Sequence, residues 1–321
     1  MLQRLLAIGG AAVLVAASPA EARNIVISND DGLTANVKAL YDALKAEGHD
    51  VIVVVPCQQQ SGMGAALSFV RPLRPLTADC VNGAARAGDP GAGPMTRAGL
   101  GGDFHYVDGT PVMALLYGLD IVAPARWGKA PDLVLSGPNI GQNAGSIVIS
   151  SGTVSNAQYA MIRGIPAIAL SAGENTGSGP DLANPRSLVV ARQSVELVGE
   201  LDRTSGGKPL LPPGTGLNVN FPDQPERAQW KLTRIGSYTR YELRFVPDLA
   251  AATGRKMPEG TPPMPGLTIG MSTAAPRADQ RNDEAWVVQS AITVSVMQIG
   301  YDAPAGTEKR LGKRLGKLTG R

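Results

Sequence analysis

Two runs of β-branched residues flank a helical pattern near the start of the chain. Residues 25–27 and 51–55 are almost entirely Ile and Val without polar alternation, which is typical of strands buried on both faces of a parallel sheet. Between the two runs, apolar residues recur at helical spacing and form one face. They are Val37, Leu40, Tyr41 and Leu44. A strand, a helix and a strand within about 30 residues predict a βαβ unit.

The same alternation continues along most of the chain. We expect further helices at 113–120, 154–163 and 188–201, and further strands at 132–136, 165–170 and 217–221. This order predicts an α/β fold, Rossmann-like, with a mostly parallel sheet and helices on both faces. The Gly- and Ala-rich stretch 82–102 lacks periodicity and predicts an exposed insertion.

The character of the sequence changes after Pro222. Residues 230–235, 241–245 and 287–297 have strand-like patterns, with a Pro-rich loop at 258–265 between them. They predict a smaller β-rich C-terminal extension, suited to oligomerisation as a homodimer or tetramer. The expected organisation is therefore a signal peptide at 1–22, a catalytic core at 23–222, the extension at 223–305 and a basic tail at 306–321.

Composition excludes several classes of site. Two Cys and two His residues in 321 rule out a disulfide-rich scaffold and a multi-Cys or multi-His metal centre. Residues 308–321 carry six cations and one anion, so the chain's net charge of +3 leaves about −2 for the rest. The body of the protein therefore gives no reason to expect a nucleic acid duplex as a partner. The basic tail either is solvated or contacts anionic lipid or nucleic acid.

The N-terminus has the pattern of an export signal. Arg4 precedes a short apolar run at 5–17, and Ala20-Glu21-Ala22 supplies a small-x-small cleavage site. Because the run is shorter than the ~20 residues of a membrane span, we expect cleavage after Ala22, a periplasmic protein and no stable membrane span. The alternative is a retained anchor. In an oxidising compartment, Cys57 and Cys80 either form a disulfide or stay as buried thiols.

Polar, glycine-bearing loops follow the predicted strands. Ligands bind open parallel sheets at the carboxyl ends of the strands, so these loops are expected to meet at one edge. Asp30 and Asp31 follow the first strand, and Ser61 and Asn139 lie in loops after two others. Adjacent carboxylates repel unless they share a partner. With hydroxyl and amide oxygens nearby, the partner suggested is a hard divalent cation, Mg²⁺, Mn²⁺ or Ca²⁺ rather than zinc, and Mg²⁺ or Mn²⁺ is the cofactor predicted. The simpler alternative for Asp30-Asp31-Gly32 alone is a turn with one Asp as a helix cap.

A fourth loop opens a predicted helix with Ser151, Gly152 and Thr153. Free N–H groups at a helix start, together with two hydroxyls, suit an oxyanion such as phosphate. An ordinary N-cap by Ser or Thr is the alternative. A carboxylate-held divalent metal next to an anion site indicates phosphate-ester chemistry.

Seven ordered blocks of the chain resemble the SurE-type 5′/3′-nucleotidases. They are 24–32 (NIVISNDDG), 53–67 (VVVPCQQQSGMGAAL), 71–74 (RPLR), 108–111 (DGTP), 131–143 (PDLVLSGPNIGQN), 150–154 (SSGTV) and 164–171 (GIPAIALS). The resemblance continues at 217–222 (LNVNFP) and, more weakly, to about residue 302. It implies a divalent-metal-dependent phosphomonoesterase that hydrolyses nucleoside 5′(3′)-monophosphates, with a Rossmann-like core and a smaller oligomerising region.

The resemblance also implies the roles of the site residues. The metal ligands would be Asp30, Asp31, Ser61 and Asn139, with Asp30 and Asp31 also catalytic. Substrate contacts would come from Asn143, Ser151, Gly152 and Thr153. The chain departs from the family pattern around 146–149, where neutral residues replace an aspartate, and at Ser150, which stands for a tyrosine. These departures bear on substrate preference and rate.

Three other functions compete with this one. A broad-specificity acid phosphatase would differ only in substrate range. A non-catalytic periplasmic nucleotide or phosphate receptor would use the same loops, but would gain nothing from two carboxylates without a metal. A dinucleotide-dependent oxidoreductase is disfavoured because no Gly-x-Gly-x-x-Gly follows the first strand.

Overall fold

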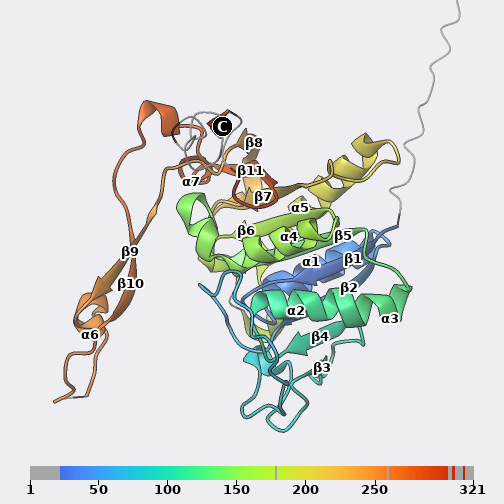
Figure 1. Ribbon diagram of the computed structural model, residues 1–321, viewed down its shortest axis with the longest axis horizontal. Coiled ribbons are helices and arrows are strands. Elements are labelled where there is room, and N and C mark those ends of the chain that lie inside the picture. Colours follow the sequence, from blue (N-terminus) through green and yellow to red (C-terminus); the bar gives the residue numbers. More distant parts are fainter. Residues whose placement is uncertain (1–21, 178, 259, 303–305, 308–313, 315–321) are drawn as a thin grey trace, which may run out of the picture.

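A twisted nine-stranded sheet forms the centre of the protein in the computed structural model (Figure 1). The structure describes residues 22–177, 179–258, 260–302, 306–307 and 314. The strand order is β3-β4-β2-β1-β5-β6-β7-β11-β8. The strands from β4 to β7 run parallel, whereas β3 and β11 pair antiparallel with β4 and β7. This confirms the predicted mostly parallel α/β sheet.

The strands are β1 (Asn24–Ser28), β2 (Asp50–Pro56), β3 (Ala92–Pro94), β4 (Phe104–Val107), β5 (Leu133–Ile140), β6 (Ala167–Ala172), β7 (Thr215–Asn220), β8 (Gln229–Thr233), β9 (Tyr241–Val246), β10 (Gly266–Met271) and β11 (Ala291–Gln298). The α-helices are α1 (Ala35–Ala46), α2 (Pro111–Tyr117), α3 (Ala123–Trp127), α4 (Gly152–Ile162), α5 (Pro185–Ser205), α6 (Leu249–Thr253) and α7 (Glu284–Val287). A π-helical turn, Gly118–Val122, joins α2 to α3.

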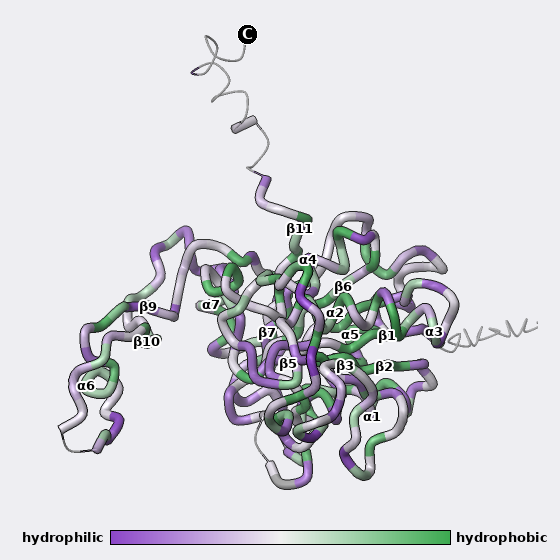
Figure 2. Tube along the Cα trace, turned by 60° about the horizontal axis from the view of Figure 1, so that its bottom comes forward, coloured by the Kyte–Doolittle hydropathy of each residue, from purple (hydrophilic) through white to green (hydrophobic). Residues whose placement is uncertain are grey.

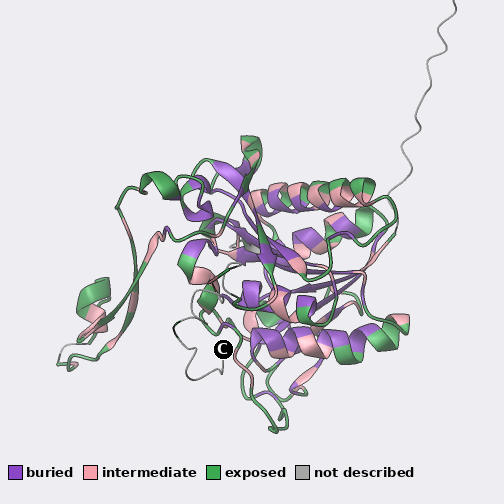
Figure 3. Cartoon of the chain, turned by 45° about the horizontal axis from the view of Figure 1, so that its top comes forward, coloured by how far each residue is buried: buried purple, intermediate pink, exposed green. Residues whose placement is uncertain are grey.

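Both faces of the sheet are buried, which explains the unbroken apolar runs. Ile25 and Ile27 belong to a core cluster shared with α1 and α5, whereas Val26, between them, belongs to a second cluster shared with α2 and α4. Successive side chains of a strand point to opposite faces, so a strand covered on both sides needs an apolar residue at every position. Figure 3 shows this buried sheet between exposed outer helix surfaces.

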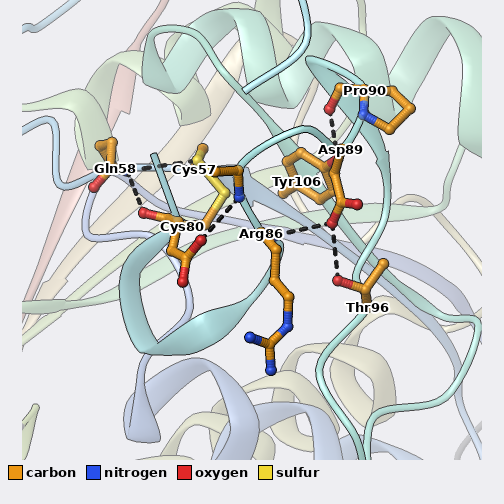
Figure 4. Close-up of a disulfide and its surroundings, with 10 residues drawn as sticks. Cys57, Gln58, Cys80, Arg86, Asp89, Pro90, Thr96 and Tyr106 are labelled. Atoms are coloured by element: carbon orange, nitrogen blue, oxygen red, sulfur yellow. Dashed lines mark hydrogen bonds between the residues drawn. A yellow bond between two sulfur atoms is a disulfide. The ribbon is translucent and has the colours of Figure 1, made fainter. Parts of the chain in front are cut away.

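The region expected as an exposed insertion is partly ordered into the sheet. Within 82–102, β3 pairs with β4, a strand that periodicity did not reveal, and Ala84 and Ala85 are buried. A disulfide between Cys57 and Cys80 ties this region to the end of β2, and the hydroxyl of Tyr106 on β4 donates to the carbonyl of Pro90 (Figure 4). Most residues of 82–102 are exposed, as expected, but the prediction of a plain insertion missed β3 and the buried contacts, because covalent and long-range contacts order a segment of weak local propensity.

The segment after Pro222 divides between two places. Strands β8 and β11 extend the central sheet beyond β7. Strands β9 and β10 form a separate antiparallel ribbon that stands away from the rest of the molecule (Figures 1 and 2). The strand expected at 287–297 begins only at Ala291, because Glu284–Val287 forms the short helix α7.

The ends of the chain lie mostly outside the described residues. The signal peptide predicted at 1–22 falls there except for Ala22, and so does most of the basic tail predicted at 306–321. Within the part of the chain that the structure describes, no helix combines the length and apolar character needed to cross a membrane.

Candidate active site

Asp30 and Asp31 lie directly beyond the end of β1, and both are almost completely buried, with 3% and 5% exposure. The turn that carries them is held by Asn29. Its side-chain amide donates to the carbonyl of Gly32 at 2.8 Å and accepts from the Gly32 N–H at 3.1 Å. Gly32 has a positive φ of 79°, and a Cβ there would lie 2.5 Å from Val81 Cγ2. The sequence at this turn therefore fixes the direction of both carboxylates.

The two carboxylates occupy an electrostatically unfavourable place for negative charge. Burial raises the pKa of Asp30 above its ordinary value, although hydrogen bonds from Thr153 and from the backbone around Gly152 oppose the shift. The pKa of Asp31 is raised to about 7, mainly by burial and to a smaller extent by repulsion from Asp30. A buried pair of this kind favours a cation as a partner for its ionised form.

The start of α4 faces Asp30. The Thr153 hydroxyl donates to Asp30 Oδ1 at 2.7 Å, and the backbone N–H groups of Gly152 and Thr153 also lower the pKa of Asp30. Ser151 is the N-cap of α4 and accepts from the Val154 N–H at 3.1 Å. A Cβ at Gly152 would lie 2.7 Å from Asp30 Cβ and 2.6 Å from Pro111 Cγ. Ser151 is therefore the N-cap of α4, and the group that the helix start faces in this structure is the carboxylate of Asp30. Phosphate binding by this loop stays a prediction.

Asn139 lies near the end of β5, beyond an irregularity in the pairing with β6 that includes a cis peptide bond between Gly137 and Pro138. The next residue, Ile140, donates its N–H to Asp31 Oδ2 at 2.8 Å. The Asn139 amide nitrogen donates to the Gly141 carbonyl at 2.7 Å, while its Oδ1 is buried and has no hydrogen-bond partner. A buried amide oxygen without a hydrogen-bond donor, on the residue before the N–H that binds Asp31, is an acceptor open to a cation.

Ser61 is brought to the same edge by its loop. The N–H of Gln60 donates to the Asp30 carbonyl at 2.7 Å, and that of Gly64 donates to the Ser150 carbonyl at 3.1 Å. Ser61 itself is exposed, and its hydroxyl accepts from the Gln59 side chain. Gln59 also lowers the pKa of Asp31. Within the described residues, no hydrogen bond joins Ser61 directly to Asp30, Asp31 or Asn139, so it borders the buried set.

Asn143 connects the site to the interior of the sheet. Its side-chain amide donates to Ser171 Oγ at 3.0 Å and to Thr153 Oγ1 at 3.3 Å. Its backbone carbonyl accepts from the side chains of Asn218 at 2.9 Å and Asn220 at 3.2 Å. A buried hydrogen-bonded chain thus runs from β7 through Asn143 and Thr153 to Asp30.

Glu284, at the start of α7, anchors the far end of this chain. Its Oε1 accepts from Asn218 Nδ2 at 2.9 Å and from the Gly145 N–H at 3.0 Å. The side chain is fully buried, and burial raises its pKa to about 7. Glu284 therefore fixes both the Asn143–Gly145 loop and β7.

Sequence reasoning missed several of these supporting groups. The alternating Asn218 and Asn220 in a buried strand are a detectable signal, because two amides on one buried face must find partners. Gln59 and Ser171 lie inside the matched blocks but carry no pattern of their own. Glu284 lies far along the chain in a segment with no distinctive motif, so only the tertiary structure reveals its role.

The donor set fits a hard divalent cation. The two carboxylates and the unpartnered Asn139 Oδ1 lie at the carboxyl ends of the neighbouring strands β1 and β5. Carboxylate and amide oxygens are ligands that Mg²⁺ and Mn²⁺ prefer. In the described part of the chain, no three His, Cys, Asp or Glu side chains gather into a metal site. A metal here would therefore need the neutral oxygens of Asn139 and Ser61 together with the two aspartates.

Comparison with known proteins gives a consistent result. The family model for survival protein SurE matches residues 25–242. A 5′/3′-nucleotidase SurE from Edwardsiella ictaluri is 32% identical over 297 residues, covering 92% of this chain and 96% of the relative. An acid phosphatase from Yarrowia lipolytica is 38% identical over 211 residues, covering 62% of this chain; the matched region spans 56% of that phosphatase.

The fold comparison agrees. The crystal structure of the SurE protein from Aquifex aeolicus superposes with a TM-score of 0.64 at 27% identity, covering 92% of this chain and 99% of that one. These similarities support a hydrolase that acts on phosphate monoesters. Because the family model covers most of the chain and relatives above 30% identity align over nearly its whole length, this protein belongs to the SurE family.

Proposed function

We propose that this protein is a metal-dependent phosphomonoesterase that hydrolyses nucleoside 5′(3′)-monophosphates to nucleoside and phosphate. The observation that carries the proposal is the buried Asp30–Asp31 pair, which contacts the start of α4 and the Ile140 N–H, beside Asn139 with its unpartnered Oδ1, at one edge of the sheet. The similarity to SurE nucleotidases and to an acid phosphatase supports the same chemistry.

Asp30, Asp31, Ser61 and Asn139 would hold the cation. A bound divalent cation supplies polarisation of the phosphoryl group and a lowered pKa for a coordinated water. One of the two carboxylates accepts the proton of the attacking water. Asn143, Ser151, Gly152 and Thr153 would contact the phosphoryl oxygens, because donors at a helix start stabilise developing negative charge. The Gly152 and Thr153 N–H groups donate to Asp30 in this structure, and would turn to the phosphoryl oxygens when the cation binds the Asp30 carboxylate.

Phosphate release by the purified protein tests this function. The substrates are a panel of nucleoside monophosphates and p-nitrophenyl phosphate, each with Mg²⁺, Mn²⁺ or EDTA. Metal-dependent release that favours nucleotides is the expected result. Metal-dependent release without such preference would identify the broad-specificity phosphatase that the Yarrowia lipolytica relative suggests. Binding without release would identify a receptor and contradict the proposal.

We also propose that the protein is exported and periplasmic, with cleavage after Ala22. The Cys57–Cys80 disulfide supports this location, because disulfides persist in oxidising compartments. N-terminal sequencing of protein recovered from a periplasmic fraction should begin at Arg23. A chain that still begins at Met1 in a membrane fraction would favour a retained anchor.

We further propose that the β9–β10 ribbon mediates a homodimer or tetramer. The register pairs Leu243 with Ile269 and Phe245 with Leu267, so these four side chains lie on one face of the ribbon, and all are exposed. An isolated two-stranded hairpin is marginally stable in water, and an exposed apolar face of this kind marks an interaction site. A second copy of the chain, offering the same apolar face, is the partner.

A further inference from the structure

A cavity of about 400 Å³ lies beside the candidate active site and is not used in the chemistry described above. It is bounded by the exposed strap 68–74, by Gln60 and by the loop that precedes α2. Its lining includes Arg71, Arg74, Asp108 and Thr110. The volume lies within the range of small-ligand sites.

The cavity shares its walls with the active site. Gln60 precedes Ser61 in the chain and donates its N–H to the Asp30 carbonyl. Thr110 precedes Pro111, whose ring packs against Gly152 next to Asp30. The Thr110 hydroxyl donates to the Ala66 carbonyl at 2.6 Å and ties the residues just before the strap to this wall. A phosphomonoester whose phosphate lies at Asp30 and Gly152 can therefore extend its leaving group into the cavity.

The charges of the lining indicate which leaving group fits. Within the described part of the chain, neither Arg71 nor Arg74 forms a side-chain hydrogen bond or an ion pair, and this includes ion pairs with Asp108 in the same lining. Arg126, by contrast, is paired with Asp50 and Asp103. The lining therefore holds two unpaired guanidinium groups and one carboxylate, which gives it a net positive charge. Guanidinium groups bind phosphate through paired hydrogen bonds, so a phosphate group suits this lining.

We infer that this cavity is a second-phosphate subsite, in which Arg71 and Arg74 bind a phosphate group carried by the substrate's leaving group. The inference rests on the proposed phosphomonoesterase function. It extends the substrate class from nucleoside monophosphates to nucleotides with a second phosphate, such as nucleoside 3′,5′-bisphosphates. Only the phosphate at Asp30 is cleaved, while the other orients the substrate.

Paired substrates test the inference. Phosphate release is measured with adenosine 5′-monophosphate and adenosine 3′,5′-bisphosphate, and kcat/KM is compared for the unaltered protein and the Arg71→Gln/Arg74→Gln double variant. We expect the unaltered protein to prefer the bisphosphate by about tenfold or more, as one strong charge-assisted contact provides. The double variant should lose that preference and keep its monophosphate activity. Arg192→Gln removes an exposed charge on α5, away from the cavity, and should leave the preference unchanged.

The outcomes separate the two proposals. Monophosphate release without any preference for the bisphosphate contradicts the subsite and leaves the enzyme function intact. An equal loss for both substrates in the double variant would show that the arginines hold the nucleoside, which also contradicts a second-phosphate subsite. Absence of all release contradicts the proposed function. The subsite is then tested by calorimetric binding of both nucleotides in EDTA. The bisphosphate should bind more tightly than the monophosphate to the unaltered protein, and this difference should vanish in the double variant.

Discussion

The hydroxyl of Thr153 donates a hydrogen bond to Oδ1 of Asp30 at 2.7 Å, although 123 residues separate the two in the chain. Asp30 lies just beyond the end of β1 and Thr153 lies in the first turn of α4, so the bond joins two elements at the carboxyl edge of the sheet. It stabilises the ionised form of a carboxylate whose pKa burial raises. The start of α4 therefore stabilises the negative charge of Asp30.

Removal of this contact should reduce activity without unfolding the protein. We expect Thr153→Val to lower kcat/KM for a nucleoside monophosphate about tenfold, because one hydrogen bond to a charged group is lost. Asp30→Asn should lower it about a thousandfold, since it removes a ligand charge and a proton acceptor. Both variants should keep the unaltered circular dichroism spectrum. Near-normal turnover by Asp30→Asn with metal present would contradict the proposed site.

Gly152 provides a steric test of the same contact. In Gly152→Ala, the added Cβ would lie 2.6 Å from Pro111 Cγ and 2.7 Å from Asp30 Cβ, closer than packed atoms allow. We expect kcat/KM to fall about a hundredfold as Asp30 is displaced. The matched control is Gly199→Ala in α5, where a Cβ would meet nothing within 4 Å. This control should keep full activity and raise the free energy of unfolding by about 0.5–1 kcal/mol. Equal activity in the two variants would mean that Gly152 does not border the reacting groups.

Glu284 should make the stability of the protein depend on pH. Its pKa in the folded protein is raised to about 7 from an ordinary 4.5. The folded state therefore binds a proton more tightly than the unfolded state. The stabilisation from that proton is complete below about pH 4.5 and is lost as the pH rises to about 7.

The Glu284→Gln variant isolates this dependence. Relative to the variant, the unaltered protein should lose up to about 3 kcal/mol of unfolding free energy between pH 4.5 and pH 8. Urea unfolding of both proteins across this pH range measures the difference. Glu196→Gln removes an exposed carboxylate from α5 and serves as a control that should show no such trend. A constant difference between the unaltered protein and Glu284→Gln at all pH values would show that Glu284 is not buried with a raised pKa.

The disulfide should contribute directly to stability. Cys57 and Cys80 are 23 residues apart and both are buried, and a closed loop of this size stabilises a fold by about 3 kcal/mol. The Cys57→Ala/Cys80→Ala variant should therefore unfold at lower urea concentration. It should also show faster proteolysis within 82–102, the segment that the bond ties to β2. Two titratable thiols in the unfolded, unreduced protein would show that the bond is not formed.

The apolar face of the β9–β10 ribbon should control assembly. Phe245→Glu places a charge at a position with 72% exposure in the single chain, and burial of that charge in an interface would be costly. We expect this variant to elute as a monomer in size-exclusion chromatography with light scattering. Arg244→Glu, one residue away on the opposite face of the ribbon, should assemble like the unaltered protein. A monomeric unaltered protein would contradict the proposed interface.

Local patterns in the sequence determined the core of the fold. The Ile and Val runs of β1 and β2, the helical face of α1 and the order of later elements required a parallel sheet, and the structure confirms it. The resemblance of seven blocks to the SurE family is likewise confirmed. These features follow from local periodicity and short motifs, and both involve residues that are close together in the chain, so they can be read from the sequence alone.

Other features depended on contacts between distant parts of the chain. The pairing of β3 with β4, the choice between a disulfide and free thiols, and the placement of β11 beside β7 could not be read locally, because each depends on which distant segment lies nearby. The same holds for Glu284, which is linked to Asp30 through Asn218, Asn143 and Thr153. Sequence determined which residues could perform the chemistry, and tertiary structure decided which buried partners set their charge, because burial and hydrogen bonding exist only once the sheet has formed.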